Sequence, residues 1–160
     1  MTNTLLDGGY DQLDLTILKE LQMNGRISVA DLARKIHLSP PAVYQRMKRL
    51  ERAGVIRQYV ALVDRQASGY DLLCFIRVSI QPHTRESLSA FQAAIESQSC
   101  VLECYHTAGG HDLLMKVVVH NQKELEKFIN EQLMAFPGVD RIETSLVLTE
   151  MKSTTALKLK

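Results

Sequence analysis

The sequence contains no tryptophan and only three cysteines among its 160 residues. Cys100 and Cys104 are four residues apart and Cys74 is distant from both, a spacing that suits neither a metal site nor a disulfide framework. We therefore expect free thiols in a reducing compartment, and neither a metal ion nor a cofactor.

Long hydrophobic runs are also missing. No apolar stretch approaches the roughly 20 residues that a membrane-spanning helix needs. Residues 1–10 lack the basic start and the apolar run of a secretion signal. These absences predict a cytoplasmic protein without a membrane partner.

A strong overall charge is the third absence, since the formal net charge is only +1. The charge is nevertheless unevenly distributed along the chain. Between residues 34 and 57 a single acid, Glu51, accompanies seven basic residues: Arg34, Lys35, Arg46, Lys48, Arg49, Arg52 and Arg57. A local basic cluster on a near-neutral chain is typical of a module that binds phosphates, although charge alone also fits a solvated helix face.

Apolar residues near the N-terminus recur at helical spacing. They predict a helix over 11–23, a second helix after the cap Ser28 and a third after the cap Ser39. The turn His37-Leu38 joins the second helix to the third. Two such helices joined by a tight turn form a helix-turn-helix.

Short runs of β-forming residues follow the third helix. Residues 55–56 and 59–63 are predicted as two strands of a β-wing, with Arg57-Gln58 near their turn. The winged helix-turn-helix domain then spans residues 1–63, and residues 64–70 read as a linker.

Residues 71–160 alternate between strand and helix patterns. They predict strands over 72–80, 101–107, 113–119 and 139–151, with helices over 85–97 and 121–136. This βαββαβ order is that of a ferredoxin-like sandwich, in which both helices cover one face of an antiparallel sheet. The predicted fold class is therefore α+β.

The other face of such a sheet has no helix to cover it. We predict that this face carries Val101, Met115, Val117, Leu146 and Leu148, which are too apolar for a wet surface. Monomers rarely expose contiguous apolar patches above a few hundred Å². Two sheets are therefore expected to pack face to face across a two-fold axis, giving a homodimer.

The helix that begins at Ser39 is the predicted recognition helix, because the second helix of such a pair enters the major groove of duplex DNA. Gln45 suits adenine, and Tyr44 and the prolines suit thymine methyl groups. Plain solvent exposure of Gln45 is the alternative. The cations are expected to contact phosphates. The predicted DNA interface comprises Ser39, Pro40, Pro41, Tyr44, Gln45, Arg46, Lys48, Arg49, Arg52 and Arg57.

The order and spacing of these residues resemble the leucine-responsive/asparagine-responsive (Lrp/AsnC) family over nearly the whole chain. In the N-terminal half the resemblance rests on Leu13-Asp14, Asn24-Gly25-Arg26, Asp31-Leu32-Ala33 and the run from Arg46 to Glu51. In the C-terminal half it rests on Gly109-Gly110-His111-Asp112, Phe136-Pro137-Gly138-Val139 and Thr144.

The resemblance implies a sequence-specific, nucleoid-associated transcription regulator that binds DNA as a dimer and assembles to a tetramer or octamer. It also implies an amino-acid effector bound between dimers. By position, the effector residues are Gly109, Gly110, His111, Asp112 and Thr144, with Leu133 and Pro137 from a neighbouring dimer. Asp112 can accept from an ammonium group, and glycine amides can donate to a carboxylate. A simple hairpin turn is the alternative for residues 109–112.

Two other functions stay open. One is an architectural protein that compacts DNA with little sequence choice, and the other is an enzyme similar in fold to the siroheme decarboxylases. No catalytic spacing supports an enzyme, since Cys104 and His106 are expected on opposite faces of one strand, which is wrong for a dyad. His106 and His111 are either site residues or sheet-edge histidines. We therefore predict a regulator rather than an enzyme.

Overall fold

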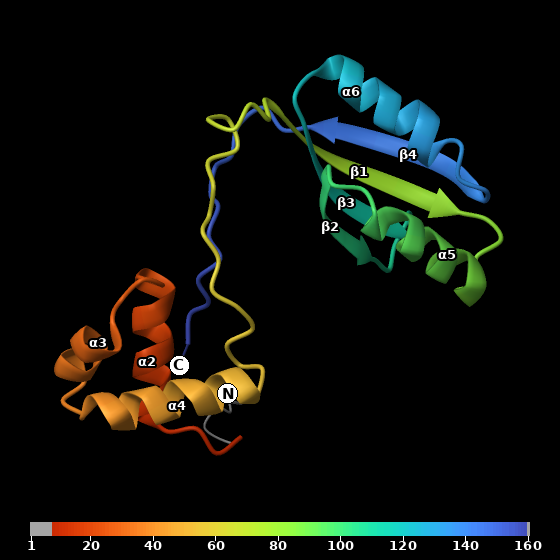
Figure 1. The fold of residues 1–160 in the computed structure, drawn as a ribbon. Helices are drawn as coiled ribbons and strands as arrows, with labels where there is room; N and C mark the ends of the chain where they lie inside the picture. The colour runs from red at the N-terminus through yellow and green to blue at the C-terminus, as the bar shows by residue number, and fades with distance from the viewer. Residues whose placement is uncertain (1–7, 160) are drawn as a thin grey trace. The chain divides into compact units, whose positions relative to one another are not determined.

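The computed structural model describes residues 8–159 (Figure 1). The chain divides into two compact units. The first consists of the residues up to Leu62 together with those from Lys152 onward, and the second is Val63–Met151. The C-terminal residues, which the sequence placed in the second domain, therefore group with the first unit. Each unit is described by itself below.

The first unit contains three helices: α2 (Gln12–Met23), α3 (Val29–Lys35) and α4 (Pro40–Arg52). The second and third helices begin after their predicted caps Ser28 and Ser39, and Asp11, predicted as the first residue of the first helix, is its cap. The side chains of all three accept hydrogen bonds from the amides three residues further on. His37 adopts a positive φ of 55° in the tight turn between α3 and α4. The predicted helix-turn-helix is confirmed.

The core of the first unit is small and apolar apart from one carboxylate. Seven buried residues form it: Ile17, Leu18, Leu32, Ala33, Ile36, Val43 and Leu50. Because Val43 and Leu50 are seven residues apart and therefore share one face of α4, their burial fixes which side of that helix is exposed.

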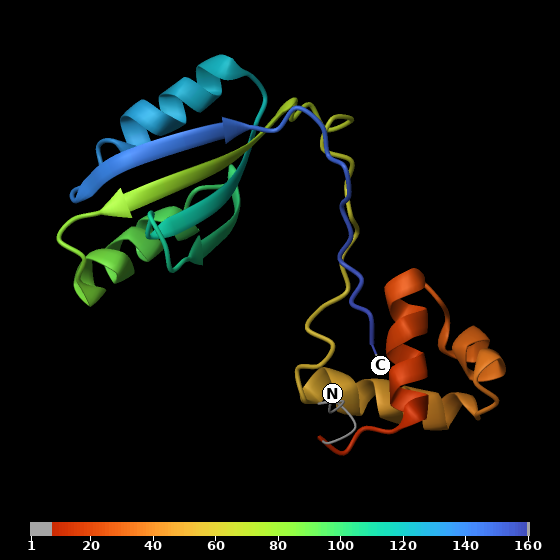
Figure 2. The ribbon, with the colours of Figure 1, turned by 180° about the vertical axis from the view of Figure 1, so that it is seen from behind.

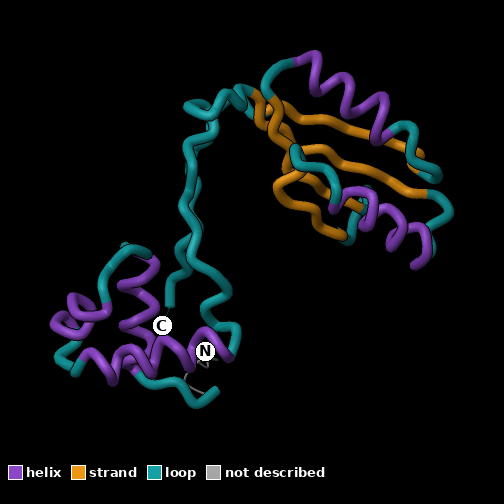
Figure 3. Tube along the Cα trace, viewed as in Figure 1, coloured by secondary structure: helices purple, strands orange, loops and turns teal. Residues whose placement is uncertain are grey.

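The two strands predicted for the wing, over 55–56 and 59–63, are absent from the structure. Residues 55–63 form no strand, and Figure 3 draws this segment as loop throughout. The amides of Val55 and Ile56 both donate to the carbonyl of Leu50, which ties the segment to the end of α4. Val60 and Leu62 are exposed. The prediction was wrong because β-forming residues make a strand only where a partner strand completes the ladder, and residues 8–159 supply none here.

The second unit is the predicted βαββαβ sandwich (Figure 2). Its sheet is antiparallel with the strand order β2-β3-β1-β4. The elements are β1 (Leu72–Ile80), α5 (Arg85–Glu96), β2 (Val101–His106), β3 (Leu113–Val119), α6 (Gln122–Lys127), which continues as the π-helix η1 (Phe128–Leu133), and β4 (Val139–Leu146).

β4 is shorter than predicted, since it ends at Leu146 rather than Met151. Leu146 pairs with Cys74, and the amide of Val147 makes a last bond to the carbonyl of Leu73. Because β1 begins at Leu72, β4 has no partner beyond this point.

The helix-covered face of the sheet holds the core of the second unit, in which every buried residue is apolar. Met115 and Val117 are buried in this core and Val101 packs against it, so the prediction that they lie on the uncovered face was wrong. Leu146 pairs with core-facing Cys74, and Leu148 lies beyond the strand. Both faces of these strands carry apolar residues, so alternation alone did not reveal which face is covered.

The uncovered face is mixed in character. Phe75 and Leu114 are half-buried there, and Tyr105 is exposed. Two ion pairs cross it between neighbouring strands. Arg77 lies 3.2 Å from Glu143, and Lys116 lies 3.1 Å from Glu103.

Candidate nucleic-acid interface and effector site

The tip of α4 is exposed and well anchored. Ser39 caps the helix by accepting from the amide of Ala42 at 3.4 Å, and Pro40 and Pro41 occupy its first two positions. With one face of α4 buried, Tyr44 and Gln45 face outward, and Tyr44 is 48% exposed. These are the residues that the sequence assigned to base reading.

A fully buried carboxylate, Asp14 of α2, takes up two of the predicted phosphate ligands. Nη1 of Arg46 lies 2.9 Å from one carboxylate oxygen of Asp14 and 2.8 Å from Asp11. Nη2 of Arg49 pairs with the other oxygen of Asp14. Asp11 and Asp14 also form a reciprocal capping box, with bonds of 3.0 and 2.9 Å.

Arg46 therefore links α4 to the start of α2 through Asp11 and Asp14, and its contact with a phosphate stays a prediction. Only 26% of its side chain is exposed, against 51% for Arg49. The hydrogen bond that Arg46 donates to the Asp14 carboxylate raises the pKa of Arg46, with a further contribution from Asp11. The sequence signal that could have revealed this cluster is the Asp11-x-x-Asp14 pair at the start of α2.

Lys48 is also partnered, but closer to the surface. Its ammonium lies 2.6 Å from Glu51 and 5.7 Å from the centre of the Tyr44 ring. The hydrogen bond with Glu51 raises the pKa of Lys48 and lowers that of Glu51. Tyr59 donates to Glu51 at 3.2 Å, and burial together with the Glu51 charge raises the pKa of Tyr59 to about 12.

Arg52 and Arg57 are the cations of this surface that remain available. Both are exposed, and neither forms an ion pair with any of residues 8–159. Arg52 is the last residue of α4, and Arg57 lies in the loop that follows it. The cluster predicted from the sequence thus separates into cations held by carboxylates and cations open to a phosphate.

The predicted effector turn follows β2 in the second unit. Gly109 has a φ of +151°, in the region that favours glycine. The turn is closed by Thr107, whose amide donates to the carbonyl of Asp112 at 2.8 Å and whose hydroxyl donates to the carbonyl of His111 at 3.0 Å. Its backbone is therefore well defined.

The Asp112 side chain already has partners for both carboxylate oxygens. Oδ2 accepts from the amide of Ile80 at 2.8 Å, and Oδ1 lies 3.0 Å from Nδ1 of His83. Asp112 therefore anchors the end of β1 in this structure. A ligand ammonium that bound Oδ1 from the side of His83 would take the place of that imidazole.

His111 lies on the uncovered sheet face, with its side chain only 16% exposed. Its Nε2 is 3.1 Å from Glu143, and its Nδ1 is 3.3 Å from the hydroxyl of Ser79. Thr144 pairs in register with Ile76, so their side chains point to the same face of the sheet. Ile76 is buried in the core, which lies on the face opposite to that of His111. One chain therefore does not bring Thr144 together with His111.

Leu133 and Pro137 lie apart from the glycine turn. Leu133 is buried in the core, and both residues line a cavity of about 230 Å³ between the end of α5 and the segment after η1. No residue of the turn Gly109–Asp112 lines this cavity.

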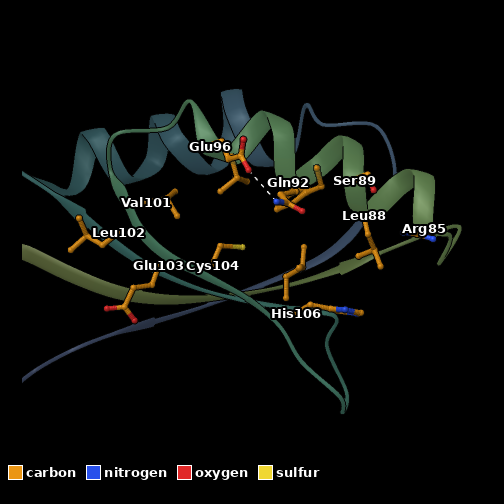
Figure 4. Close-up of a pocket in the computed structure, with 13 residues that line it drawn as sticks. Arg85, Leu88, Ser89, Gln92, Glu96, Val101, Leu102, Glu103, Cys104 and His106 are labelled. Atoms are coloured by element: carbon orange, nitrogen blue, oxygen red, sulfur yellow. Dashed lines mark hydrogen bonds between the residues drawn. The ribbon is translucent and has the colours of Figure 1, made fainter. Parts of the chain in front are cut away.

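A larger cavity of about 490 Å³ lies between α5 and the edge strand β2 (Figure 4). Its walls mix apolar and polar side chains, with Arg85 at one end. Cys104 and His106 both line it, so the expectation that they lie on opposite faces was wrong, because residues two apart on a strand share a face. Burial raises the pKa of the Cys104 thiol, which disfavours the thiolate that a nucleophile needs.

None of the helices within 8–159 has the length and apolarity that crossing a bilayer requires. In the same residues, no three His, Cys, Asp or Glu side chains are grouped so that they could hold a metal ion.

Comparison with family models accounts for both units. Residues 10–57 match the model described as winged helix-turn-helix DNA-binding, and residues 73–157 match the Lrp/AsnC ligand binding domain.

Known proteins match over nearly the full length. The leucine-responsive regulatory protein of Rhizobium meliloti (strain 1021) is 37% identical over 142 residues, which is 89% of this chain and 91% of that protein. The leucine-responsive regulatory protein of Escherichia coli (strain K12) is 33% identical over 150 residues, covering 94% and 92%. These relatives are transcription regulators and not enzymes.

A solved structure agrees closely. The transcriptional regulator NMB0573 of Neisseria meningitidis, in complex with L-Met, superposes with a TM-score of 0.89 at 35% identity and covers 94% of this chain and 97% of that one. E. coli AsnC gives a TM-score of 0.85 at 27% identity, covering 92% and 97%. With a DNA-binding helix-turn-helix and a matching ligand-binding domain in one chain, the protein belongs to the Lrp/AsnC family of transcription regulators.

Proposed function

We propose that the chain is a sequence-specific regulator whose binding to duplex DNA is controlled by an amino acid. The observation that carries the DNA half is the exposed, capped tip of α4. Gln45 lies there with a side chain that bonds to none of residues 8–159, and Tyr44 stands beside it. A recognition helix uses these positions to read base edges in the major groove.

We assign the phosphate contacts first to the cations that form no ion pair with a carboxylate. Arg52 and Arg57 are the primary candidates, and Lys48 and the exposed part of Arg49 are secondary. Arg46 acts indirectly, by holding α4 on α2. This division assigns affinity and selectivity to different residues of one surface.

Fluorescence anisotropy with duplexes selected from a random pool tests this division. Arg52→Ala and Arg57→Ala should each weaken binding to every duplex and lower the slope of log affinity against log salt by about one. Gln45→Ala should change which duplexes are preferred and leave the slope unchanged. Lys127→Ala in the second unit is the matched control. Unaltered slopes for both arginine variants would contradict the assignment, and a selection without a consensus would favour the architectural alternative.

We propose an amino acid as the effector, as supported by the L-Met complex of the Neisseria relative. Its site would combine Gly109, Gly110, His111, Asp112 and Thr144 with Leu133 and Pro137 of a neighbouring dimer. The ligand ammonium would replace His83 at Oδ1 of Asp112. The carboxylate would take amides of the glycine turn.

A thermal-shift screen of the twenty amino acids tests this site, because a ligand that binds the native state raises its melting temperature. Asp112→Ala should abolish the shift. His83→Ala is the paired variant, since it frees Oδ1 and should preserve or enlarge the shift. A normal response from Asp112→Ala would place the effector elsewhere.

We also propose that the uncovered sheet face joins two chains, and that such dimers assemble into a tetramer or octamer at the nucleoid of the cytoplasm. Half-buried Phe75 and Leu114 supply the apolar part of that face. The two recognition helices of a dimer suit two half-sites one helical turn apart. Light scattering of Phe75→Glu should show a smaller assembly than the wild type.

A further inference from the structure

The C-terminal segment Lys152–Leu159 belongs to the first unit although the chain reaches it from the second. We propose that this segment, here called the strap, docks on the helix-turn-helix and holds it in the form that binds DNA. The chain therefore connects the two units twice, after Leu62 and again after Met151.

One side chain of α2 recognises the backbone of the strap. The Leu157 amide donates to Oε1 of Gln22 at 2.6 Å, and Nε2 of Gln22 donates to the Leu157 carbonyl at 3.2 Å. A single carboxamide thus satisfies both main-chain groups of one residue, which fixes the register of the strap on α2. The Leu157 side chain is 73% exposed, so it contributes little to this contact.

An apolar contact lies two residues further on. Leu159 is half-buried and packs against the core cluster of the first unit, which includes Val43 and Leu50 of α4. The strap thereby adds apolar cover to the core that orients the recognition helix.

The rest of the strap is weakly held. Residues 152–158 are exposed and form no helix or strand. Within them, the Ala156 amide donates to the Thr154 hydroxyl at 3.1 Å. A segment held mainly at Gln22 and at Leu159 can detach without unfolding either unit, because local openings cost least where few buried contacts are lost.

Because the strap follows directly after the effector-binding unit, effector binding can change how the strap docks on the DNA-binding unit. This step rests on the proposed function. Only four residues separate the end of β4 at Leu146 from Met151, after which the strap begins. β4 carries Thr144, a proposed effector residue. An effector that binds better when β4 is in the strap-docked arrangement would raise the docked population.

Leu157→Pro tests docking, because proline removes the donated N–H while the wild-type side chain is already exposed. Leu157→Ala is the matched control, since it keeps the N–H. Gln22→Ala removes the same two bonds from the other side. Amide exchange, melting of the first unit and affinity for a selected duplex are measured on full-length chains without ligand.

Leu157→Pro and Gln22→Ala should each lower the melting temperature of the first unit by about 4–8 °C. Both should weaken DNA binding severalfold and speed exchange of the amides that neighbour residue 157, and Leu157→Ala should do none of these. Equal behaviour of the proline and alanine variants would overturn the proposal, as would free-peptide exchange of the Leu157 amide in the wild type.

A second arm adds L-methionine and compares its effect on DNA affinity in the two Leu157 variants. The alanine variant should keep the wild-type response and the proline variant should lose it while still binding L-methionine. A full response from the proline variant would exclude the strap as the route. Failure of the wild type to bind any amino acid would refute the proposed effector instead, and the ligand-free measurements would still decide docking.

Discussion

The two units of the chain bury different kinds of side chain. The second unit has a core of twelve buried residues, all apolar, between its helices and sheet. The first unit buries one carboxylate, Asp14, and that residue is the only buried charged side chain among residues 8–159. Asp14 holds two arginines of the recognition helix, so the orientation of that helix depends on charge pairing as well as apolar packing.

Removing a buried apolar group lowers stability by an amount that grows with the cavity it leaves. Removing one partner of a buried ion pair lowers stability because the other partner loses its hydrogen bonds and its opposite charge. The two units are therefore expected to respond differently to the loss of a buried side chain. The predictions below use that difference, beginning with the largest expected effect.

Phe91→Ala should reduce the free energy of unfolding of the second unit by about 4 kcal/mol. Phe91 is 1% exposed and packs edge-on against Phe136 with ring centres 5.1 Å apart. Urea unfolding followed by circular dichroism should show an earlier transition for that unit alone. Phe91→Leu, which keeps most of the volume, should cost less than half as much, and similar losses for the two variants would contradict the packing argument.

Asp14→Ala should reduce the stability of the first unit by about 2 kcal/mol, because it removes the acceptor of Arg46, of Arg49 and of the Asp11 amide in the capping box. Duplex affinity should fall with it, since α4 loses its link to α2. The same urea experiment and an anisotropy titration measure both effects. Asp31→Ala is the control, because its pair with Arg34 is exposed and should matter little.

The smallest effect concerns pH. A hydrogen bond from the Asp14 amide lowers the pKa of Asp11, with further contributions from Arg46. A depressed carboxyl pKa contributes stability that is present above its ordinary value and is lost as the pH falls through the folded-state value. Unfolding of the first unit followed from pH 6 downward should therefore show a flatter pH dependence below about pH 4 in Asp11→Asn. Asp71→Asn, at an exposed position of the second unit, should leave that profile unchanged.

Local features of the fold were predictable because local chemistry causes them. The caps Asp11, Ser28 and Ser39 each bond within the next three residues, so helix starts follow from a few neighbouring letters. The βαββαβ order followed from periodicity in the same way. The β-wing and the last five residues of the fourth strand failed because a strand needs a partner, which neighbouring residues do not specify.

The sequence indicated which residues belong to the candidate sites, but it did not indicate which side chains pair with them in the fold. The sequence assigned Arg46 and Arg49 to phosphates and Asp112 to a ligand ammonium, and each side chain has an internal partner in the structure. Those partners lie 29 or more residues away in the sequence, beyond the reach of any spacing rule. Gln45 and Tyr44 were assigned from the helical period alone, and they are exposed as that period requires.

By itself, the sequence determined the two kinds of unit, the helix that carries Gln45, and the succession of strands and helices along the chain. It could do so because hydrophobic period and capping act over a few residues. Tertiary structure alone decided which sheet face is covered, which cations remain open and where the last eight described residues lie. Those outcomes depend on contacts between distant segments, such as Gln22 with Leu157, 135 residues apart. Such contacts form only after the chain has folded, and no local pattern encodes them.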